Sequence, residues 1–278
     1  MMSSGKGTAM GGTGIGGVFD AGAREFDAWG ARLWDPIGEA TVGACSPKGG
    51  ERVLDACCGA GASALPAAAA VAPDGTVDAV DLSEALLAQG RERAARAGIG
   101  NVRFVRADAA AWPEPGAYDL VQVVHGVAFF PDMDAGTAAL AGTLRPGGRM
   151  AVTVWAEGAL AGFLTLYFEA IGAETGTRPE PPGFQQARDR IADAARLTAW
   201  LEGLGLVCEH VARHDHRVPL DAASAWEFVQ GNAARGLMDG LDAPARERVR
   251  TRLADLMAER GVAELDASFT VALARRPD

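Results

Sequence analysis

The stretch of sequence that decides the fold is Val53-Leu54-Asp55-Ala56-Cys57-Cys58-Gly59-Ala60-Gly61-Ala62-Ser63. It reads as a short buried strand, then an acid, then a glycine turn that opens a helix. Gly59 and Gly61 carry no Cβ, so the chain can turn sharply there and a ligand can approach the backbone closely. The first amides of the following helix suit an anionic group. The sequence therefore predicts a ligand-binding turn between the first strand and the first helix of an α/β sheet.

Beyond this turn, short apolar runs alternate with alanine-rich amphipathic stretches. This alternation is typical of βαβ units and a parallel sheet. We predict strands at residues 52–56, 76–80, 102–106, 118–124, 149–154, 206–212 and 268–274. We predict helices between them at residues 63–71, 83–97, 133–144 and 193–204.

One α/β domain is expected over residues 49–278, with helical insertions near residues 157–191 and 219–265. Residues 18–48 carry aromatic side chains at roughly helical spacing and are predicted to form a helical cover. Residues 1–17, mostly Gly, Ser, Thr and Met, are predicted to be a flexible tail. The end of this tail matches a dinucleotide-binding pattern by letter only. No strand precedes it, so we interpret the match as accidental.

Three acids stand at the ends of three successive predicted strands. The charge of Asp55 would oppose a pyrophosphate but suits a ligand that carries an ammonium group. Asp81 is placed to accept hydrogen bonds from both hydroxyls of a ribose. Asp108 is predicted either to accept from an adenine amino group or to cap the short turn that follows it. Ser83 is predicted to be the N-cap of the next helix.

Together with the strand at residues 118–121 and the run Leu144-Arg145-Pro146-Gly147-Gly148, these features resemble class I S-adenosylmethionine (SAM)-dependent methyltransferases. The nearest group is the ubiquinone and menaquinone methyltransferase-like enzymes, and the resemblance is strong over residues 50–155. It implies an α/β, Rossmann-like, seven-stranded mixed sheet with an antiparallel last strand and helices on both faces. The first insertion comes directly after the fifth predicted strand, and this placement favours a helical lid over the acceptor. The family turn usually has glycine where this chain has Cys57. We expect Cys57 to keep a negative φ and to alter packing rather than binding.

The resemblance implies that SAM binds at the strand ends and that its methyl group passes to a small, largely apolar molecule. In-line displacement from a sulfonium requires approach geometry and exclusion of water more than it requires a catalytic group. The residues expected to bind SAM are Asp55, Ala56, Cys57, Gly59, Gly61, Asp81, Leu82, Ala107, Asp108, Ala109 and His125.

The methyl acceptor is expected beside the residues that follow the fourth strand. His125 stands there, and we weigh two roles for it: a general base that titrates near pH 6.5, shifted somewhat downward by the cationic sulfonium, or a packing residue. The residues expected to contact the acceptor are Phe26, Trp29, Phe129, Phe130, Phe163 and Tyr167. Phe163 and Tyr167 lie on an aromatic stripe of the first insertion, and plain core packing is the alternative role for that stripe. The sequence does not decide among oxygen, nitrogen and carbon as the acceptor atom.

Two rival functions fit some of the same motifs. The spacing Gly59-x-Gly61-x-x-Ala64 also satisfies a nicotinamide fingerprint, so an NAD-dependent oxidoreductase is the enzymatic alternative. A catalytically inactive SAM-binding regulatory protein is the other alternative.

Composition narrows the classes of partner. The net charge is −10 and no long basic run is present, which argues against nucleic acid. The four cysteines show neither a CxxC pair nor zinc-ligand spacing, so no metal site and no disulfide framework are expected, which fits a cytoplasmic setting. No apolar run approaches the roughly 18 residues that span a bilayer, so no membrane association is expected. Formation of a homo-oligomer stays open.

Overall fold

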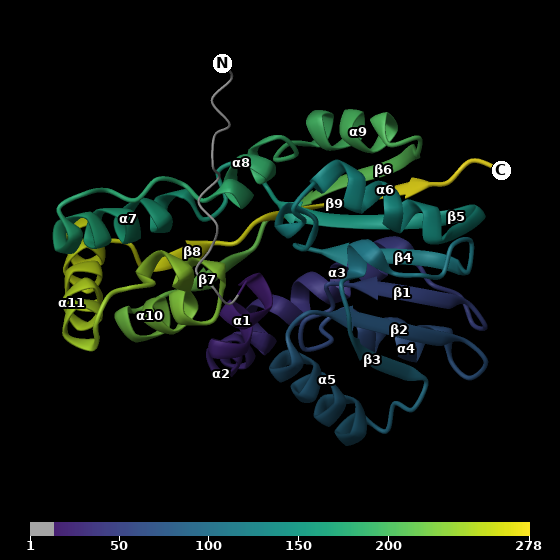
Figure 1. The fold of residues 1–278 in the computed structure, drawn as a ribbon, viewed down its shortest axis with the longest axis horizontal. Helices are drawn as coiled ribbons and strands as arrows, with labels where there is room; N and C mark the ends of the chain where they lie inside the picture. Colours follow the sequence, from purple (N-terminus) through teal and green to yellow (C-terminus); the bar gives the residue numbers. More distant parts are fainter. Residues whose placement is uncertain (1–13) are drawn as a thin grey trace, which may run out of the picture.

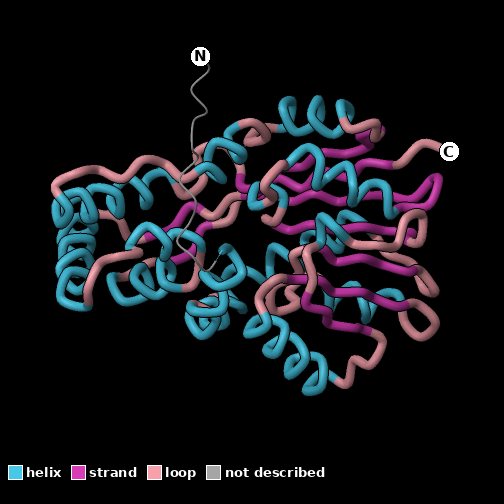
Figure 2. The backbone as a smooth tube through the Cα atoms, viewed as in Figure 1, coloured by secondary structure: helices cyan, strands magenta, loops and turns pink. Residues whose placement is uncertain are grey.

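The centre of the fold is a seven-stranded sheet, seen edge to edge on the right of Figures 1 and 2. The computed structural model describes residues 14–278. The strand order is β3-β2-β1-β4-β5-β9-β6. The strands are β1 (Arg52–Ala56), β2 (Thr76–Asp81), β3 (Val102–Arg106), β4 (Tyr118–Val124), β5 (Leu144–Trp155), β6 (Val207–His214) and β9 (Phe269–Arg275). The last strand, β9, runs antiparallel to both β5 and β6, while the other pairs are parallel. The predicted seven-stranded mixed sheet is confirmed.

Helices cover both faces of this sheet, which is why its central strands are largely apolar. On one face, α3 (Asp35–Cys45), α4 (Ala64–Val71) and α5 (Glu84–Ala97) pack on the strands in one apolar cluster. On the other, α6 (Met133–Thr143) and α9 (Ala194–Gly203) form a second cluster. The four helices predicted between the strands correspond to α4, α5, α6 and α9, with ends that differ by about one residue.

The N-terminal part of the described chain is helical. It consists of α1 (Gly14–Ala21), α2 (Ala23–Ala28), a π-helical turn η1 (Gly30–Trp34) and α3. The predicted flexible tail is therefore wrong at residues 14–17, which belong to α1 and pack on the loop after β2. A Cβ at Gly16 would lie 3.0 Å from the Cβ of Leu82. The remainder of the predicted tail, residues 1–13, lies outside the described residues.

The two insertions fold together beside the sheet, on the left of Figure 1. The first provides α7 (Ala161–Thr175) and α8 (Gly183–Asp189), and the second provides α10 (Ala222–Gln230), the 3-10 turn η4 (Ala233–Met238) and α11 (Ala243–Arg260). Two three-residue strands, β7 (Arg217–Pro219) and β8 (Glu264–Asp266), pair antiparallel and were not predicted from the sequence. Trp29 of the N-terminal cover shares the apolar core of these helices.

The cover and the insertions touch through two glycines. A Cβ on Gly22 would lie 2.3 Å from the backbone oxygen of Gln230, and a Cβ on Gly231 would lie 2.6 Å from the backbone nitrogen of Phe26. A side chain at either position would push the two backbones apart. The two glycines therefore allow α2 to pack closely against the end of α10. This packing in turn positions the aromatic residues of the cover.

No helix within residues 14–278 combines the length and the apolar character that a bilayer span requires.

Candidate active site

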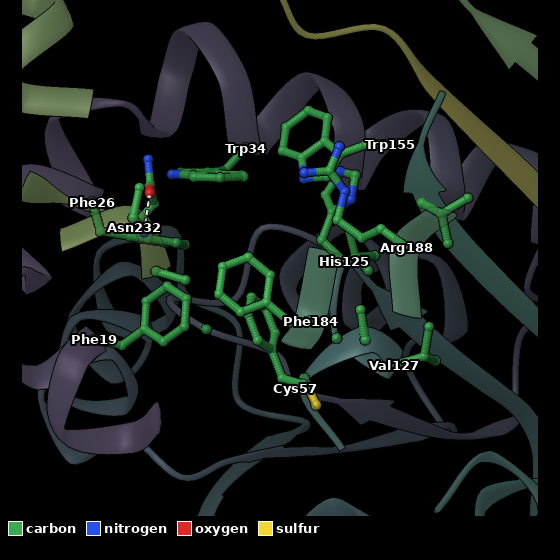
Figure 3. Close-up of a pocket in the computed structure, with 18 of the residues that line it drawn as sticks. Phe19, Phe26, Trp34, Cys57, His125, Val127, Trp155, Phe184, Arg188 and Asn232 are labelled. Atoms are coloured by element: carbon green, nitrogen blue, oxygen red, sulfur yellow. Dashed lines mark hydrogen bonds between the residues drawn. The ribbon is translucent and has the colours of Figure 1, made fainter. Parts of the chain in front are cut away.

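A cavity opens where β1, β2 and β4 end, which is the edge at which open α/β sheets bind ligands (Figure 3). Apolar and aromatic side chains make up most of its wall. Its lining residues come from the N-terminal cover, the glycine turn, the ends of the strands and both insertions. They are Phe19, Phe26, Trp34, Cys57, Cys58, Gly59, Ala62, Ser63, Asp81, Leu86, Val124, His125, Gly126, Val127, Ala128, Phe129, Val154, Trp155, Leu160, Leu164, Phe184, Gln185, Arg188, Ile191, Phe228, Asn232, Ala233, Ala234 and Leu237.

The glycine turn is tied to the end of β2. The backbone amide of Gly59, at φ +52°, donates to Oδ2 of Asp81 at 2.9 Å, and the amide of Ser83 donates to Oδ1 at 2.8 Å. Burial raises the pKa of the Asp81 carboxyl above its usual range, and these amides act in the opposite direction. Gly61, at φ +83°, also favours the absence of a side chain, because a Cβ would lie only 3.1 Å from the ring of Phe104. Asp81 is thus held at the floor of the cavity by backbone donors.

Cys57 adopts a left-handed backbone, with φ at +58°. The expectation of a negative φ was wrong: the turn keeps the conformation that glycine would adopt, although a side chain makes this conformation cost about 1–2 kcal/mol. The side chain packs against Gly126, the second residue after β4. A Cβ at Gly126 would lie 2.6 Å from the Cβ and 2.8 Å from the Sγ of Cys57. The glycine that follows β4 therefore leaves space for the side chain of the cysteine that follows β1.

Asp55 lies beneath the turn and is fully buried. The hydroxyl of Ser63 donates to its Oδ2 at 2.7 Å, and its Oδ1 has no hydrogen-bond partner within residues 14–278. Burial raises the pKa of this carboxyl to about 7, although Ser63 and Gln122 act to lower it. Neither Asp55 nor the equally buried Ala56 lines the cavity. Here Asp55 ties the start of α4 to β1, and its contact with a ligand ammonium stays a prediction.

The third predicted acid, Asp108, is exposed and caps the 3-10 turn η2 (Ala109–Ala111) by accepting from the amide of Ala110 at 3.0 Å. The capping alternative is confirmed, and the contact with adenine stays a prediction. Other residues expected to bind SAM also lie outside the cavity wall, namely Gly61, Leu82, Ala107 and Ala109.

Ser83 is the N-cap of α5, as predicted, because its hydroxyl accepts from the amide of Leu86 at 3.2 Å. The same hydroxyl donates to Oδ1 of Asp20 at 2.6 Å, and the amide of Ala85 donates to that oxygen at 3.0 Å. Asp20 of α1 therefore holds the cover on the loop that follows Asp81. No sequence motif pointed to Asp20.

His125 leaves the end of β4 in a left-handed conformation, with φ at +55°. Its ring stacks on Trp155, with centroids 3.9 Å apart and planes at 17°, as Figure 3 shows. Neither ring nitrogen has a hydrogen-bond partner within the described chain. Burial and, to a smaller extent, the Arg188 cation lower the pKa of His125 to about 3. The imidazole is therefore uncharged at neutral pH, and the expected titration near pH 6.5 is corrected to a much lower pH.

Two of the aromatic residues expected to contact the acceptor, Phe26 and Phe129, line the cavity. Phe26 stacks on Trp34, with centroids 4.7 Å apart and planes at 10°. Phe19 meets Phe26 edge to face at 6.1 Å and Phe129 at 5.8 Å. These four rings connect the cover to the loop after β4.

The other four belong to the packing of the protein. Trp29, Phe163 and Tyr167 are buried in the core of the insertions, and the hydroxyl of Tyr167 donates to the backbone of Ala234 at 3.1 Å. Phe130 packs in front of α6, where it lies 2.7 Å from the position of a Cβ at Gly136. The structure thus places these four side chains off the cavity wall, and core packing accounts for them.

The sequence did not point to Gln185 and Arg188, which line the side of the cavity formed by α8. Phe184, Gln185 and Arg188 face the cavity from this helix, and the ring of Phe184 lies 5.2 Å from that of Phe129. The signal available was the four-residue spacing of Phe184 and Arg188, which places both on one helix face. It was weaker than the longer aromatic stripe of α7, which is core.

Within residues 14–278 no group of three histidine, cysteine or acidic side chains is placed to hold a metal ion. All four cysteines are free thiols.

Comparison with known proteins places this site in context. A family described as "Methyltransferase domain" matches residues 53–148, the segment from β1 to the start of the long strand β5. The chain is 32% identical to nocamycin O-methyltransferase of Saccharothrix syringae over 201 residues, which cover 66% of this chain and 71% of that protein. It is also 32% identical to demethylmenaquinone methyltransferase of Geobacillus kaustophilus, over 43% of this chain and about half (51%) of that protein.

The fold also matches solved structures almost end to end. The crystal structure of the [4+2]-cyclase SpnF superimposes with a TM-score of 0.58 at 18% identity, covering 95% of this chain and 99% of that one. At this identity the match concerns the fold alone. The family assignment therefore rests on the sequence relatives and the methyltransferase domain.

Proposed function

Because this chain belongs to the family of SAM-dependent methyltransferases, we propose that it transfers a methyl group from SAM to a small, largely apolar molecule held in the cavity of Figure 3. One observation carries this proposal: a single cavity joins the glycine turn and Asp81 to a chamber walled by aromatic side chains. The first part suits a nucleoside and the second an apolar acceptor. Neither an NAD-dependent oxidoreductase nor an inactive regulatory protein gains support from the relatives.

The residues present suit SAM. Gly59 and the left-handed Cys57 bring the backbone of the turn to the cavity, and Asp81 is held there by two backbone amides with lone pairs left for ribose hydroxyls. SAM supplies an electrophilic methyl group when bound. The chain supplies orientation and an apolar wall that excludes water. The uncharged ring of His125, stacked on Trp155, forms part of that wall.

A screen of candidate acceptors with isotope-labelled SAM, followed by mass measurement of the product, tests this function. Transfer of label to a small molecule is the expected result. Binding of SAM with no transfer to any acceptor would instead favour the regulatory alternative.

The substitution Asp81→Ala is expected to weaken binding of SAM and of its demethylated product by on the order of 1–3 kcal/mol, because the ribose would lose a charged acceptor. Titration calorimetry measures this directly. Asp242→Ala is the matched control, because this acid caps α11, which contributes no residue to the cavity. A folded Asp81→Ala protein with wild-type affinity would contradict the assignment of Asp81.

Binding of cofactor product and acceptor together is expected to slow amide exchange in α8 and in α1–α2, because these helices place Phe184 and the ring of Phe19 against Phe129 across the cavity. Hydrogen exchange with mass detection tests this. The amides of α11, which contributes no residue to the cavity, provide an internal reference. Equal protection of α8 with and without ligands would show that it is fixed scaffold.

We also propose a cytoplasmic setting and no nucleic acid partner. The free thiols of Cys45, Cys57, Cys58 and Cys208 and the net charge of −10 support these two proposals. Assembly into a homo-oligomer stays a prediction that sedimentation of the purified chain tests.

A further inference from the structure

The wall of the cavity contains one arginine, Arg188 of α8, which lies beside His125 in Figure 3. Its Nε atom is buried and has no hydrogen-bond partner within residues 14–278. The arginines that follow it in sequence are paired: Arg190 binds Asp134 at 2.9 Å and Arg196 binds Asp193 at 2.9 Å. The guanidinium of Arg188 forms no such ion pair with a carboxylate of the described chain.

This placement is costly without an anion. Burial lowers the pKa of Arg188 to about 10, so the side chain is still protonated at neutral pH. Arg188 is half-buried, and an unpartnered cation in such an apolar wall is unfavourable, which is why proteins normally pair such groups. His125, its neighbour, is uncharged at neutral pH and offers no compensating charge. A bound sulfonium would add a second cation to the same apolar chamber.

We propose that Arg188 binds an anionic oxygen group of the methyl acceptor, so that the acceptor is an apolar acid carrying a carboxylate or an ionised hydroxyl. This inference rests on the proposed function, because it assigns the acceptor of the same cavity. A guanidinium matches a carboxylate with two parallel hydrogen bonds, and it donates a charge-assisted hydrogen bond to an ionised hydroxyl. Phe184, one helical turn earlier on α8 and in contact with Phe129, provides an apolar surface for the rest of the molecule.

The reaction then balances without a base. A lone pair of the ionised oxygen forms the new bond to the methyl carbon, and the electron pair of the broken carbon–sulfur bond stays on sulfur. No proton has to be removed. Among the other titratable groups of the wall, burial raises the pKa of Cys57 and Cys58 well above the usual range, and His125, with a pKa of about 3, is a poor proton acceptor. The Asp81 carboxylate, at the glycine turn, already accepts from the amides of Gly59 and Ser83.

Binding of paired probes tests the proposal in the presence of saturating S-adenosylhomocysteine. The carboxylate pair is 2-naphthoate and the isosteric neutral 2-naphthamide. The acidic-hydroxyl pair is 2-hydroxy-1,4-naphthoquinone and its neutral 2-methoxy counterpart. We expect wild-type protein at pH 7.5 to bind at least one anion about tenfold or more tightly than its neutral partner, and the preferred pair identifies the acidic group.

Arg188→Met is expected to abolish this preference while binding of S-adenosylhomocysteine is unchanged, and Arg188→Lys should retain part of it. Arg190→Met is the matched control, because it removes a paired, exposed arginine at the end of the same helix. The proposal is overturned if both anions fail to bind better than their neutral partners, or if the preference survives in Arg188→Met. Failure of wild-type protein to bind S-adenosylhomocysteine would instead overturn the proposed function.

Discussion

Between pH 7 and pH 4.5, the His125→Asn variant is expected to gain up to about 3 kcal/mol of stability relative to wild type. In the folded protein the pKa of His125 is about 3, against roughly 6.5 in an unfolded chain. Below pH 6.5 the imidazole of His125 is therefore protonated in the unfolded state but not in the folded state. Taken alone, His125 therefore lowers the free energy of unfolding of the wild type as the pH falls toward 3, by up to about 1.4 kcal/mol per pH unit, and the variant lacks this contribution. Asparagine suits the site because it tolerates a left-handed backbone.

Asp55 has the opposite effect. Its folded pKa is about 7, against roughly 3.9 in an unfolded chain, so here the folded state takes up the proton first as the pH falls. This carboxyl makes the wild type more stable as the pH drops from 7 toward 4. Asp55→Asn is therefore expected to lose stability relative to wild type over this range. The two buried groups oppose each other in the wild type, and each substitution exposes the pH dependence of the other.

Urea unfolding at four pH values between 4.5 and 7.5 measures both differences. His210→Asn, at an exposed position of β6, controls for the loss of an imidazole in itself. Stability curves for His125→Asn and wild type that run parallel across this range would contradict the buried, uncharged state of His125.

The same placement sets an expectation for catalysis. Because His125 does not change charge between pH 5.5 and 9, it should impose no pH dependence on the single-turnover rate in that range. This agrees with an acceptor that arrives already ionised.

Much of the fold could be predicted because the relevant signals are local. A strand buried on both faces must be largely apolar, and a glycine turn before a helix can be recognised in eleven consecutive residues. These features located the sheet, Asp81 and the turn at Gly59. Strands β7 and β8 could not be found in this way, because they are three residues long and lie far apart in sequence.

The wall of the cavity was harder to predict because packing partners are not local. The aromatic residues of α7 have the spacing of either a lid or a core helix, and only the presence of α10 and α11 beside them makes them core. The environment of His125 depends on Trp155 and Arg188, which come from other elements. Its pKa could not be inferred from its position after a strand.

The close contact between Cys57 and Gly126 leaves no space for a side chain at position 126. Gly126→Ala is expected to destabilise the protein by about 3 kcal/mol, at the upper end of the usual cost of overpacking. The added Cβ would lie 2.6 Å from the Cβ of Cys57, whose direction is fixed by the left-handed backbone, so rotation of the thiol cannot relieve the clash. Either the turn or the end of β4 must shift.

Cys57→Gly removes both clashing atoms, and the nearest remaining contact of an alanine at 126 is then Cγ1 of Val123 at 3.3 Å. The double variant is therefore expected to recover about 2 kcal/mol or more of the loss, a coupling that chemical denaturation of the four proteins measures. Gly142→Ala is the control, because a Cβ there meets nothing within 4 Å. Additive losses would show that the two positions do not press on each other. Coupled losses would mean that a cysteine at this turn requires a glycine after β4. Affinity for S-adenosylhomocysteine should then fall in Gly126→Ala and return in the double variant, because the same displacement moves the backbone that meets the cofactor.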